Sequence, residues 1–390
     1  MTLFGKIAFY FGLLFLGQLW CQSANTSSET IKKNPRNYTV RVLLQEVLKS
    51  EPVEWNISSA KDFIIINLES KTKTKIDKKK LLISTKKNFL VINGIAYNSK
   101  QLYIYSDKNL IFEDKEYQGS FLITQDEKKT YLINSLDLED YVCSVLRTES
   151  WPGWPLEVNK AFAIASRSYV IGIILSNRQS KLPYHVKNTN KHQTYSGVHT
   201  NQVLKDAVAQ TKGIFLAYDN KPIIAMFDSC CGGVIPAHIH GVNFADAPYL
   251  ARSYACNFCK DCKVYTWSAQ FTLDYIEQLV QKEYRQLKKI KQVKVAKTDK
   301  AGLVQQVHFK GHNKQFSLTG KKVYSMFSKK IKSFYFDIAL QANKIIFTGK
   351  GLGHHLGLCQ WGAREMVRQG YNYKSILSFY YPETSFMKLQ

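Results

Sequence analysis

The sequence has few acidic residues for its size: 30 Asp and Glu stand against 54 Lys and Arg, which gives a formal net charge of +24 at pH 7. Such an imbalance is compatible with binding to nucleic acid, to an anionic membrane or to an acidic cell-wall polymer, and it does not distinguish among them. Zinc-finger spacing, a phosphate-binding loop and an aromatic RNA-binding signature are all lacking. We therefore expect no nucleic-acid partner.

Long apolar runs are also scarce. The run IAFYFGLLFL at residues 7–16 follows Lys6 and precedes the polar stretch CQSANTSSE. Its ten residues are too few for a comfortable membrane span, whereas the arrangement is typical of an export signal. We predict a signal peptide over residues 1–23 and a linker over residues 24–37. The mature protein would then lie in the periplasm or cell envelope, with an uncleaved N-terminal membrane tether as the alternative.

Cysteine is sparse but clustered. Removal of Cys21 with the signal leaves eight minus one, or seven, cysteines, and an odd number implies a free thiol or an intermolecular bond. Two adjacent cysteines and a CxxCxxC run form a set of five: Cys230, Cys231, Cys256, Cys259 and Cys262. Because an exported chain meets an oxidising compartment, we expect disulfides between the first pair and the loop at residues 255–263. Zinc held by thiolates is the alternative.

The pattern of apolar residues predicts an α+β protein. Seven short runs rich in β-branched and aromatic residues precede Ser135, which indicates a β-rich N-terminal region over residues 38–134. A mixed α+β domain is expected over residues 135–390, where helical and strand patterns alternate between residues 264 and 348.

Residues 136–169 predict two helices joined by an elbow of tryptophan and proline, with Ser135 as the N-cap of the first helix. One face of that helix carries three apolar residues and a carboxylate, at steps of four, three and four: Leu138, Val142, Val145 and Glu149. Partial desolvation near Trp151 and Trp154, together with the negative end of the helix dipole, favours a protonated Glu149. A general acid requires such a proton near neutral pH. The alternative is that Glu149 simply faces solvent.

Two cations follow on the second helix. Lys160 and Arg167 are seven residues apart, hence close to one line along the helix, and could direct two charges toward one anionic group of a substrate. A solvated pair or an internal salt bridge is the alternative.

These stretches resemble a known signature. The run LEDYV, followed by TESWPGWPLEVNKAFAIASRSYV, is similar to that of the SpoIID/LytB family, whose members act on bacterial peptidoglycan during sporulation or division. In that family the glutamate before the proline-containing elbow is the catalytic residue of a lytic transglycosylase, which implies this role for Glu149. The resemblance also implies a SpoIID-like catalytic domain over residues 135–390. Phe162 and Ser166 depart from the family pattern.

The polar stretch after the second helix also matches the family. His192, Gln193 and Tyr195 are candidates for sugar contacts, or they are ordinary loop residues. Some family members hold zinc here through histidines and cysteines. This chain supplies His185 and His192 but no cysteine between residues 184 and 199, so we expect no metal and no cofactor.

Two glycine-rich motifs complete the resemblance. In DSCCGG, Ser229, Gly232 and Gly233 match a family pattern, and the glycines permit a ligand to approach main-chain N–H groups. A plain tight turn is the alternative.

The second motif, GKGLGHHLGLCQWGA, resembles the closing signature of the family. His354 and Gln360 match it, while His355 replaces a glycine and Cys359 replaces a serine. We expect Gln360 to contact substrate. His354 would bond Glu149 or a sugar hydroxyl, or would lock its own loop.

The resemblance as a whole implies an exported lytic transglycosylase. It would cleave the bonds between N-acetylmuramic acid (MurNAc) and N-acetylglucosamine (GlcNAc) in peptidoglycan glycan strands stripped of stem peptides, leave 1,6-anhydro ends, and work with an N-acetylmuramoyl-L-alanine amidase. Two alternatives stay open: a non-catalytic, glycan-binding enhancer of an amidase, and a basic surface protein that binds nucleic acid or anionic lipid through charge alone.

Overall fold

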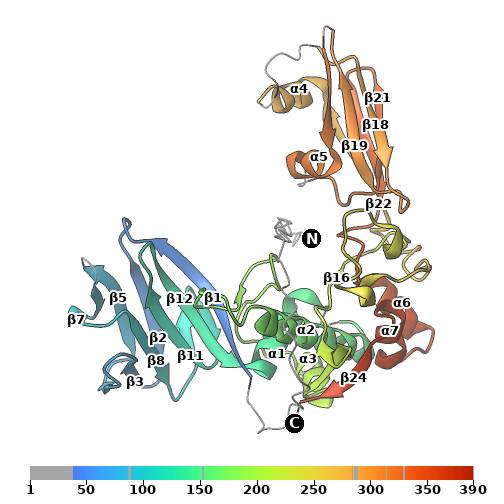
Figure 1. Cartoon of the computed structure of the whole chain (residues 1–390). Helices are drawn as coiled ribbons and strands as arrows, with labels where there is room; N and C mark the ends of the chain where they lie inside the picture. Colours follow the sequence, from blue (N-terminus) through green and yellow to red (C-terminus); the bar gives the residue numbers. More distant parts are fainter. Residues whose placement is uncertain are drawn as a thin grey trace, which may run out of the picture. The chain divides into compact units, whose positions relative to one another are not determined.

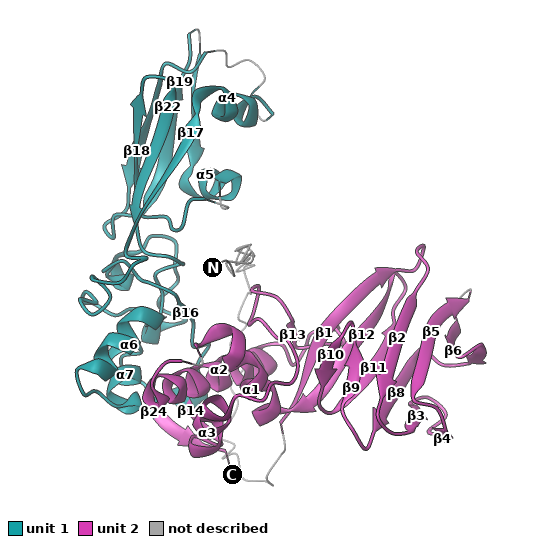
Figure 2. Cartoon of the chain, turned by 180° about the vertical axis from the view of Figure 1, so that it is seen from behind, with its two compact units in different colours: residues 1–11, 216–385 teal, residues 12–215, 386–390 magenta. Residues whose placement is uncertain are grey.

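The computed structural model describes residues 38–86, 89–151, 153–282, 284, 289–312, 314–327 and 330–389. The predicted signal peptide and linker lie outside these described residues. The described chain forms two compact units (Figure 2). We call them the N-terminal unit, residues 38–215 with 386–389, and the C-terminal unit, residues 216–385. The protein is mixed α+β with a strong β content, as the sequence predicts.

The N-terminal unit begins with two sheets (Figure 1). The larger sheet has seven strands in the order β13 (Val186–Lys187), β1 (Thr39–Leu48), β12 (Lys129–Asp137), β11 (Ser120–Gln125), β8 (Gln101–Ser106), β3 (Phe63–Asn67) and β4 (Lys73–Ile76). The other has six strands in the order β10 (Lys115–Tyr117), β9 (Leu110–Phe112), β2 (Glu54–Ser59), β5 (Lys80–Lys86), β6 (Phe89–Ile92) and β7 (Ile95–Tyr97). Phe112 of β9 and Phe121 of β11 meet edge to face with ring centroids 6.4 Å apart, and both are buried. The two sheets therefore share an apolar core.

Three helices follow in the same unit: α1 (Leu138–Glu149), α2 (Leu156–Ser176) and α3 (Gln202–Gln210). Helix α1 follows β12 without a break. Its N-cap is Asp137, whose carboxylate accepts a hydrogen bond from Glu139 N at 2.8 Å. The predicted cap, Ser135, is wrong because this residue is still paired within the sheet, opposite Arg41 and Ser120.

Helix α2 is the central helix of the unit. It is long and apolar enough to cross a membrane, yet 72% of its most apolar window is buried inside the protein. Its neighbours α1 and α3 both pack against it. The small residues Ala161, Ala165 and Gly172 are buried and allow neighbouring elements to approach α2 closely.

The C-terminal unit opens with short elements: β14 (Ile214–Tyr218), which leads the chain out of the N-terminal unit, β15 (Lys221–Pro222), β16 (Phe227–Asp228) and the 3-10 turns η1 (Pro236–His238) and η2 (Pro248–Leu250). Two three-stranded sheets follow, β17 (Thr266–Thr272) with β22 (Lys344–Lys350) and β21 (Phe336–Gln341), and β18 (Gln292–Thr298) with β19 (Val304–Lys310) and β20 (Gln315–Thr319). They share one apolar core with α4 (Leu273–Gln281) and α5 (Gly320–Phe327). The chain ends with β23 (Leu358–Cys359), α6 (Gln360–Arg368), α7 (Tyr373–Tyr380) and β24 (Ser385–Lys388).

The division into units differs from the expected boundary at residue 135. The compact units separate between residues 215 and 216, so the β-rich region and the two predicted helices belong together. The physical reason is the continuous passage from β12 into α1, together with the pairing of β13, which lies after α2 in sequence, with β1.

Candidate active site

Glu149 is the last residue of α1, at the end of the predicted apolar stripe. Leu138, Val142 and Val145, the other residues of that stripe, are 2% exposed or less. Ser150 caps the helix by donating its N–H to Leu146 O. Glu149 itself is only partly exposed, so it does not extend freely into solvent as the alternative interpretation required.

The carboxylate of Glu149 is held by the loop that follows β13. Thr194 N donates to Glu149 Oε1 at 2.6 Å, and Thr148 Oγ1 donates to Thr194 O at 2.5 Å. Burial raises the pKa of Glu149, and the hydrogen bonds from Thr194 oppose that rise without cancelling it. A carboxyl group that keeps its proton more readily than usual has the property that a general acid needs.

Two tyrosines respond to the charge of Glu149. Burial raises the pKa of Tyr141 on α1 and of Tyr169 on α2, and the negative charge of Glu149 raises both further. Both phenols therefore remain protonated and can donate hydrogen bonds over the whole physiological range. Two neutral phenols thus lie close enough to Glu149 to be affected by its charge.

Gln193 and Tyr195 fix the loop that carries Thr194. Tyr141 donates its hydroxyl to Gln193 Oε1 at 3.0 Å and stacks on Tyr195, with ring centroids 5.7 Å apart. Tyr195 in turn donates to Asn134 Oδ1 on β12 at 2.5 Å. Gln193 and Tyr195 are 0% and 4% exposed, so in the structure they pack against protein, and a sugar contact for either stays a prediction.

The histidines of this loop bond to backbone groups. His192 Nδ1 accepts from Lys187 N at 3.3 Å, and burial lowers its pKa to about 4, so its ring is neutral at physiological pH. His185 Nδ1 accepts from Arg41 N at 3.1 Å. Neither imidazole belongs to a group of possible metal ligands among the described residues.

The two cations of α2 take part in ion pairs within the protein. Lys160 Nζ lies 2.7 Å from Glu157 Oε1. Arg167 is fully buried and binds Glu139 in a bidentate pair, with N···O distances of 2.5 and 2.9 Å. The internal salt bridge, which the sequence left open, is therefore what the structure shows. Arg167 therefore joins α2 to the first turn of α1.

The two glycine motifs meet in the C-terminal unit, although they lie about 120 residues apart. Strands β16 and β23 pair in parallel, with Asp228 opposite Cys359. Cys230 and Leu352 exchange two backbone hydrogen bonds of 3.0 and 2.8 Å. Gly232 has φ +61°, and an added Cβ would come within 2.8 Å of Gly351 N, so a larger residue would separate the two motifs.

The histidines of the second motif stabilise its loop. His355 stands where the family pattern has glycine and still adopts a left-handed φ of +69°. Its N–H donates to Asp228 Oδ2 at 2.7 Å, and its Nδ1 lies 2.9 Å from Cys231 O. His354 Nδ1 accepts from Leu356 N at 3.1 Å, as expected for a histidine that locks the loop. Burial lowers the pKa of both rings to about 4.

The remaining predicted contact residues lie close to these turns. Ser229 O accepts from Trp361 N at 3.1 Å, and Gln360 is the first residue of α6. Gly232 and Gly233 line a pocket of about 240 Å³ that also receives Lys300, Lys350 and Tyr265. Ligand binding at this turn stays a prediction.

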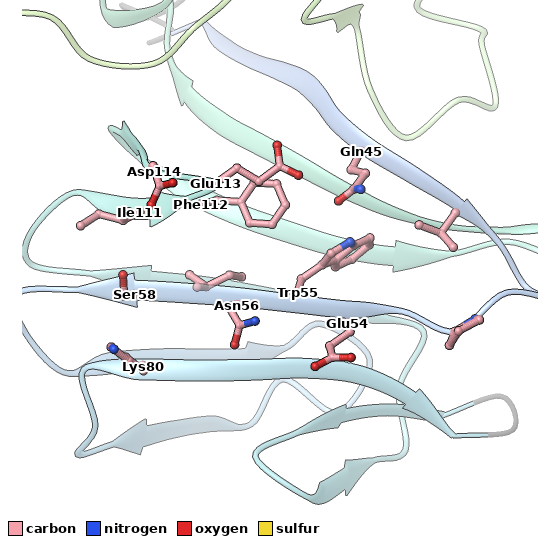
Figure 3. Close-up of a pocket in the computed structure, with 13 residues that line it drawn as sticks. Gln45, Glu54, Trp55, Asn56, Ser58, Lys80, Ile111, Phe112, Glu113 and Asp114 are labelled. Carbon is pink, nitrogen blue, oxygen red and sulfur yellow. The ribbon is translucent and has the colours of Figure 1, made fainter.

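A larger pocket, about 730 Å³, lies in the β-rich region (Figure 3). It is lined by residues of β1, β2, β5 and β9, among them Trp55, Asn56 and Lys80. None of its lining residues belongs to α1, α2 or the loop of Thr194. Sequence reasoning gave no signal for this pocket, because its residues come from strands that are separated in the chain.

Comparisons with known proteins find a family match in the part of the chain that contains Glu149. Residues 126–218, which include α1, α2 and Thr194, match the family SpoIID, described as stage II sporulation protein. Residues 249–357 match DUF8618, a domain of unknown function.

Relatives extend the similarity over more of the chain. An uncharacterized protein of Brachyspira hyodysenteriae is 28% identical over 88% of this chain and 91% of its own length. The stage II sporulation protein D of Bacillus subtilis is 26% identical over 65% of this chain and 75% of its own length. The amidase enhancer of the same species is 26% identical over 62% of this chain but only 39% of its own length. Glu149, at the end of α1, lies inside the matched region, so residues 126–218 of this chain carry a domain of the SpoIID family.

Proposed function

We propose that the protein is an exported peptidoglycan lytic transglycosylase with Glu149 as its acid and base. One observation carries the proposal: a partly buried carboxyl group, with its pKa raised by burial, is held by a backbone N–H at the end of a buried helical face. The SpoIID domain over residues 126–218 supports a role on the cell wall.

The chemistry needs a single carboxyl group. Most glycoside hydrolases use two, one to protonate the leaving oxygen and one to activate water or to attack the sugar. In the proposed reaction Glu149 protonates the oxygen between MurNAc and GlcNAc as that bond breaks. The 6-hydroxyl of the same MurNAc then attacks its anomeric carbon, and the ionised Glu149 accepts the hydroxyl proton. The product is a 1,6-anhydro ring, no water is consumed, and the enzyme recovers its starting protonation state.

The surroundings of the acid suit a sugar polymer. Trp151, two residues beyond Glu149, is 62% exposed and offers a broad apolar face next to the end of α1. The net charge of +24 favours encounter with acidic cell-wall material. Strands stripped of stem peptides, the substrate implied by the family, would link the protein to an N-acetylmuramoyl-L-alanine amidase.

The decisive experiment is digestion of purified glycan strands, freed of peptides, by the purified exported protein alone. Mass spectrometry of the soluble products should show 1,6-anhydro-MurNAc ends with the wild type and none with Glu149→Gln. Glu127→Gln, an exposed acid of the same unit, is the control and should match the wild type. Equal product from the wild type and Glu149→Gln would remove the catalytic assignment, and reducing ends in place of anhydro ends would indicate a hydrolase.

A second candidate function is that of a non-catalytic enhancer of an amidase. It is favoured by the likeness to a protein named amidase enhancer. In this case the chain would bind glycan and accelerate peptide removal by an added amidase, and Glu149→Gln would stimulate as well as the wild type does. Stimulation without anhydro products from either variant would decide for the enhancer.

A further inference from the structure

Four cysteines of the C-terminal unit bring their sulfur atoms together. We call Cys231, Cys256, Cys259 and Cys359 the cysteine cluster. Their Sγ atoms all lie within 4.8 Å of one another, and each residue is 1% exposed or less. The seven cysteines among the described residues form no disulfide, so the disulfides expected from the sequence are not what this structure contains.

The spacing of the sulfurs suits a single tetrahedral ion. Zinc–sulfur bonds of about 2.3 Å place two ligands of a tetrahedron about 3.8 Å apart. Cys231 Sγ and Cys259 Sγ are separated by 3.7 Å. A disulfide would need a separation of about 2.05 Å and could join the sulfurs only in pairs.

The cluster also has the polar surroundings that bound thiolates require. Cys359 Sγ accepts hydrogen bonds from Cys231 N at 3.3 Å and from Gly362 N at 3.4 Å. Cys256 Sγ lies 3.2 Å from the hydroxyl of Tyr380, which is fully buried. Donors aimed at ligand sulfurs stabilise their negative charge and fix their orientation. The position of Cys359 at the N-terminus of α6 adds the positive end of a helix dipole.

Gly362 leaves room for the sulfur atoms because it has no side chain. A Cβ added at Gly362 would lie 2.0 Å from the Tyr380 hydroxyl and 3.0 Å from Cys256 Sγ. Any larger residue there would displace both the donor and the ligand. The Gly362 position is therefore fitted to the cluster as well as to the start of α6.

We propose that the cysteine cluster binds one structural zinc ion. Four thiolates favour zinc or iron over harder ions, and a closed shell of four protein ligands leaves no position for substrate, which is the pattern of structural zinc sites. The ion would join the turn after β16, which holds Cys231, to the CxxC turn at residues 256–259 and to the end of β23, and so would hold the two glycine motifs together. This proposal takes the alternative that the sequence left open for these cysteines, zinc held by thiolates, in place of the expected disulfides and of the general expectation of no metal, and it does not depend on the proposed activity.

Direct measurements on the wild-type protein test the site. Elemental analysis of protein purified without added chelator should give about one zinc per chain. X-ray absorption should show four sulfur neighbours at about 2.3 Å. After exchange for cobalt, strong visible bands and thiolate charge-transfer absorption should mark a tetrahedral sulfur site. Metal-free protein whose mass shows these four sulfurs oxidised to disulfides would overturn the proposal, and so would nitrogen or oxygen ligands.

Matched variants distinguish the cluster from its neighbours. Cys259→Ser should lose the ion. Cys262→Ser should keep it, although Cys262 belongs to the same CxxCxxC run, because its Sγ lies beside Cys230 at 3.6 Å and outside the cluster. Cys143→Ser, in the N-terminal unit, should also keep it. Loss of the ion in Cys262→Ser and its retention in Cys259→Ser would contradict the assignment. If Cys259→Ser does not fold, the wild-type spectra decide alone.

Discussion

The candidate acid of the N-terminal unit and the cysteine cluster of the C-terminal unit are built in different ways. Glu149 owes its position to the local periodicity of α1, and its principal hydrogen-bond donor, Thr194, is 45 residues away. The cluster joins segments up to 128 residues apart, and no helical or strand period links them. A site of the first kind can be found in a sequence by counting, whereas a site of the second kind becomes visible only when the chain has folded.

Replacement of the acid should have the largest effect. Glu149→Gln keeps the size and the acceptor oxygen of the side chain but removes the transferable proton. We expect the release of anhydro products to fall about 100- to 10,000-fold, the usual range for loss of a general acid or base. Initial rates of product release, measured by mass spectrometry, check this. An equal fall in a Cys262→Ser variant would show that the assay reports folding, not chemistry.

The ion pairs of α2 should differ strongly from each other in stability. Arg167→Met removes the cation from the largely buried Glu139, which keeps the N–H of Gly213 as a hydrogen-bond donor, and should lower the free energy of unfolding by about 2–4 kcal/mol. Lys160→Met removes a pair that is partly open to solvent and should cost about 0–1 kcal/mol. Urea unfolding of both variants measures the difference. Similar costs for the two would mean that the buried Arg167 pair stabilises the fold no more than the partly exposed Lys160 pair does.

Much of the N-terminal unit follows from the sequence for clear reasons. The stripe that ends in Glu149 has a period of one helix face, and its three apolar members are buried as predicted. Thr194, by contrast, was missed, because a backbone N–H carries no signal in a sequence and the contact depends on the pairing of β13 with β1. The role of Arg167 was left open for a similar reason, since its partner Glu139 lies 28 residues away on another helix.

In the C-terminal unit the sequence identified the right residues but not their arrangement. The five cysteines of residues 230–262 were recognised as a set, yet the structure separates Cys230 and Cys262 from the cluster and adds Cys359. Cys359 was noted only as a replacement for serine in a family pattern. The parallel pairing of β16 with β23 decides this grouping, and such long-range pairing cannot be deduced from spacing.

Alanine variants of two glycines in this unit should distinguish the cost of a steric clash from the cost of an unfavourable backbone conformation. Gly241 and Gly353 both have positive φ, but a Cβ at Gly241 meets nothing within 4 Å, while one at Gly353 would lie 2.3 Å from Asp228 Cβ. Both alanine variants bear the backbone cost of about 1–2 kcal/mol. Gly353→Ala should lose a further ~1–3 kcal/mol through overpacking. Chemical unfolding of the two variants measures the difference. Equal losses in the free energy of unfolding would mean that the two glycine motifs can move apart at this contact without an energetic cost.

The smallest expected effect is the pH dependence that Glu149 adds to the stability of the protein. Burial raises the pKa of Glu149 in the folded protein above its value of about 4.3 in an unfolded chain, so between these two values the folded state binds more protons than the unfolded state. The free energy of unfolding should therefore be highest below the unfolded pKa, fall as pH rises through this window, and lack the contribution of Glu149 above the folded pKa. The glutamine of Glu149→Gln cannot titrate. The free energy of unfolding of this variant, relative to that of the wild type, should therefore increase with pH and then level off. Urea unfolding of both proteins from pH 4 to pH 8 measures this difference in stability. If it does not change with pH, the carboxyl group of Glu149 is as well solvated in the folded protein as in the unfolded chain.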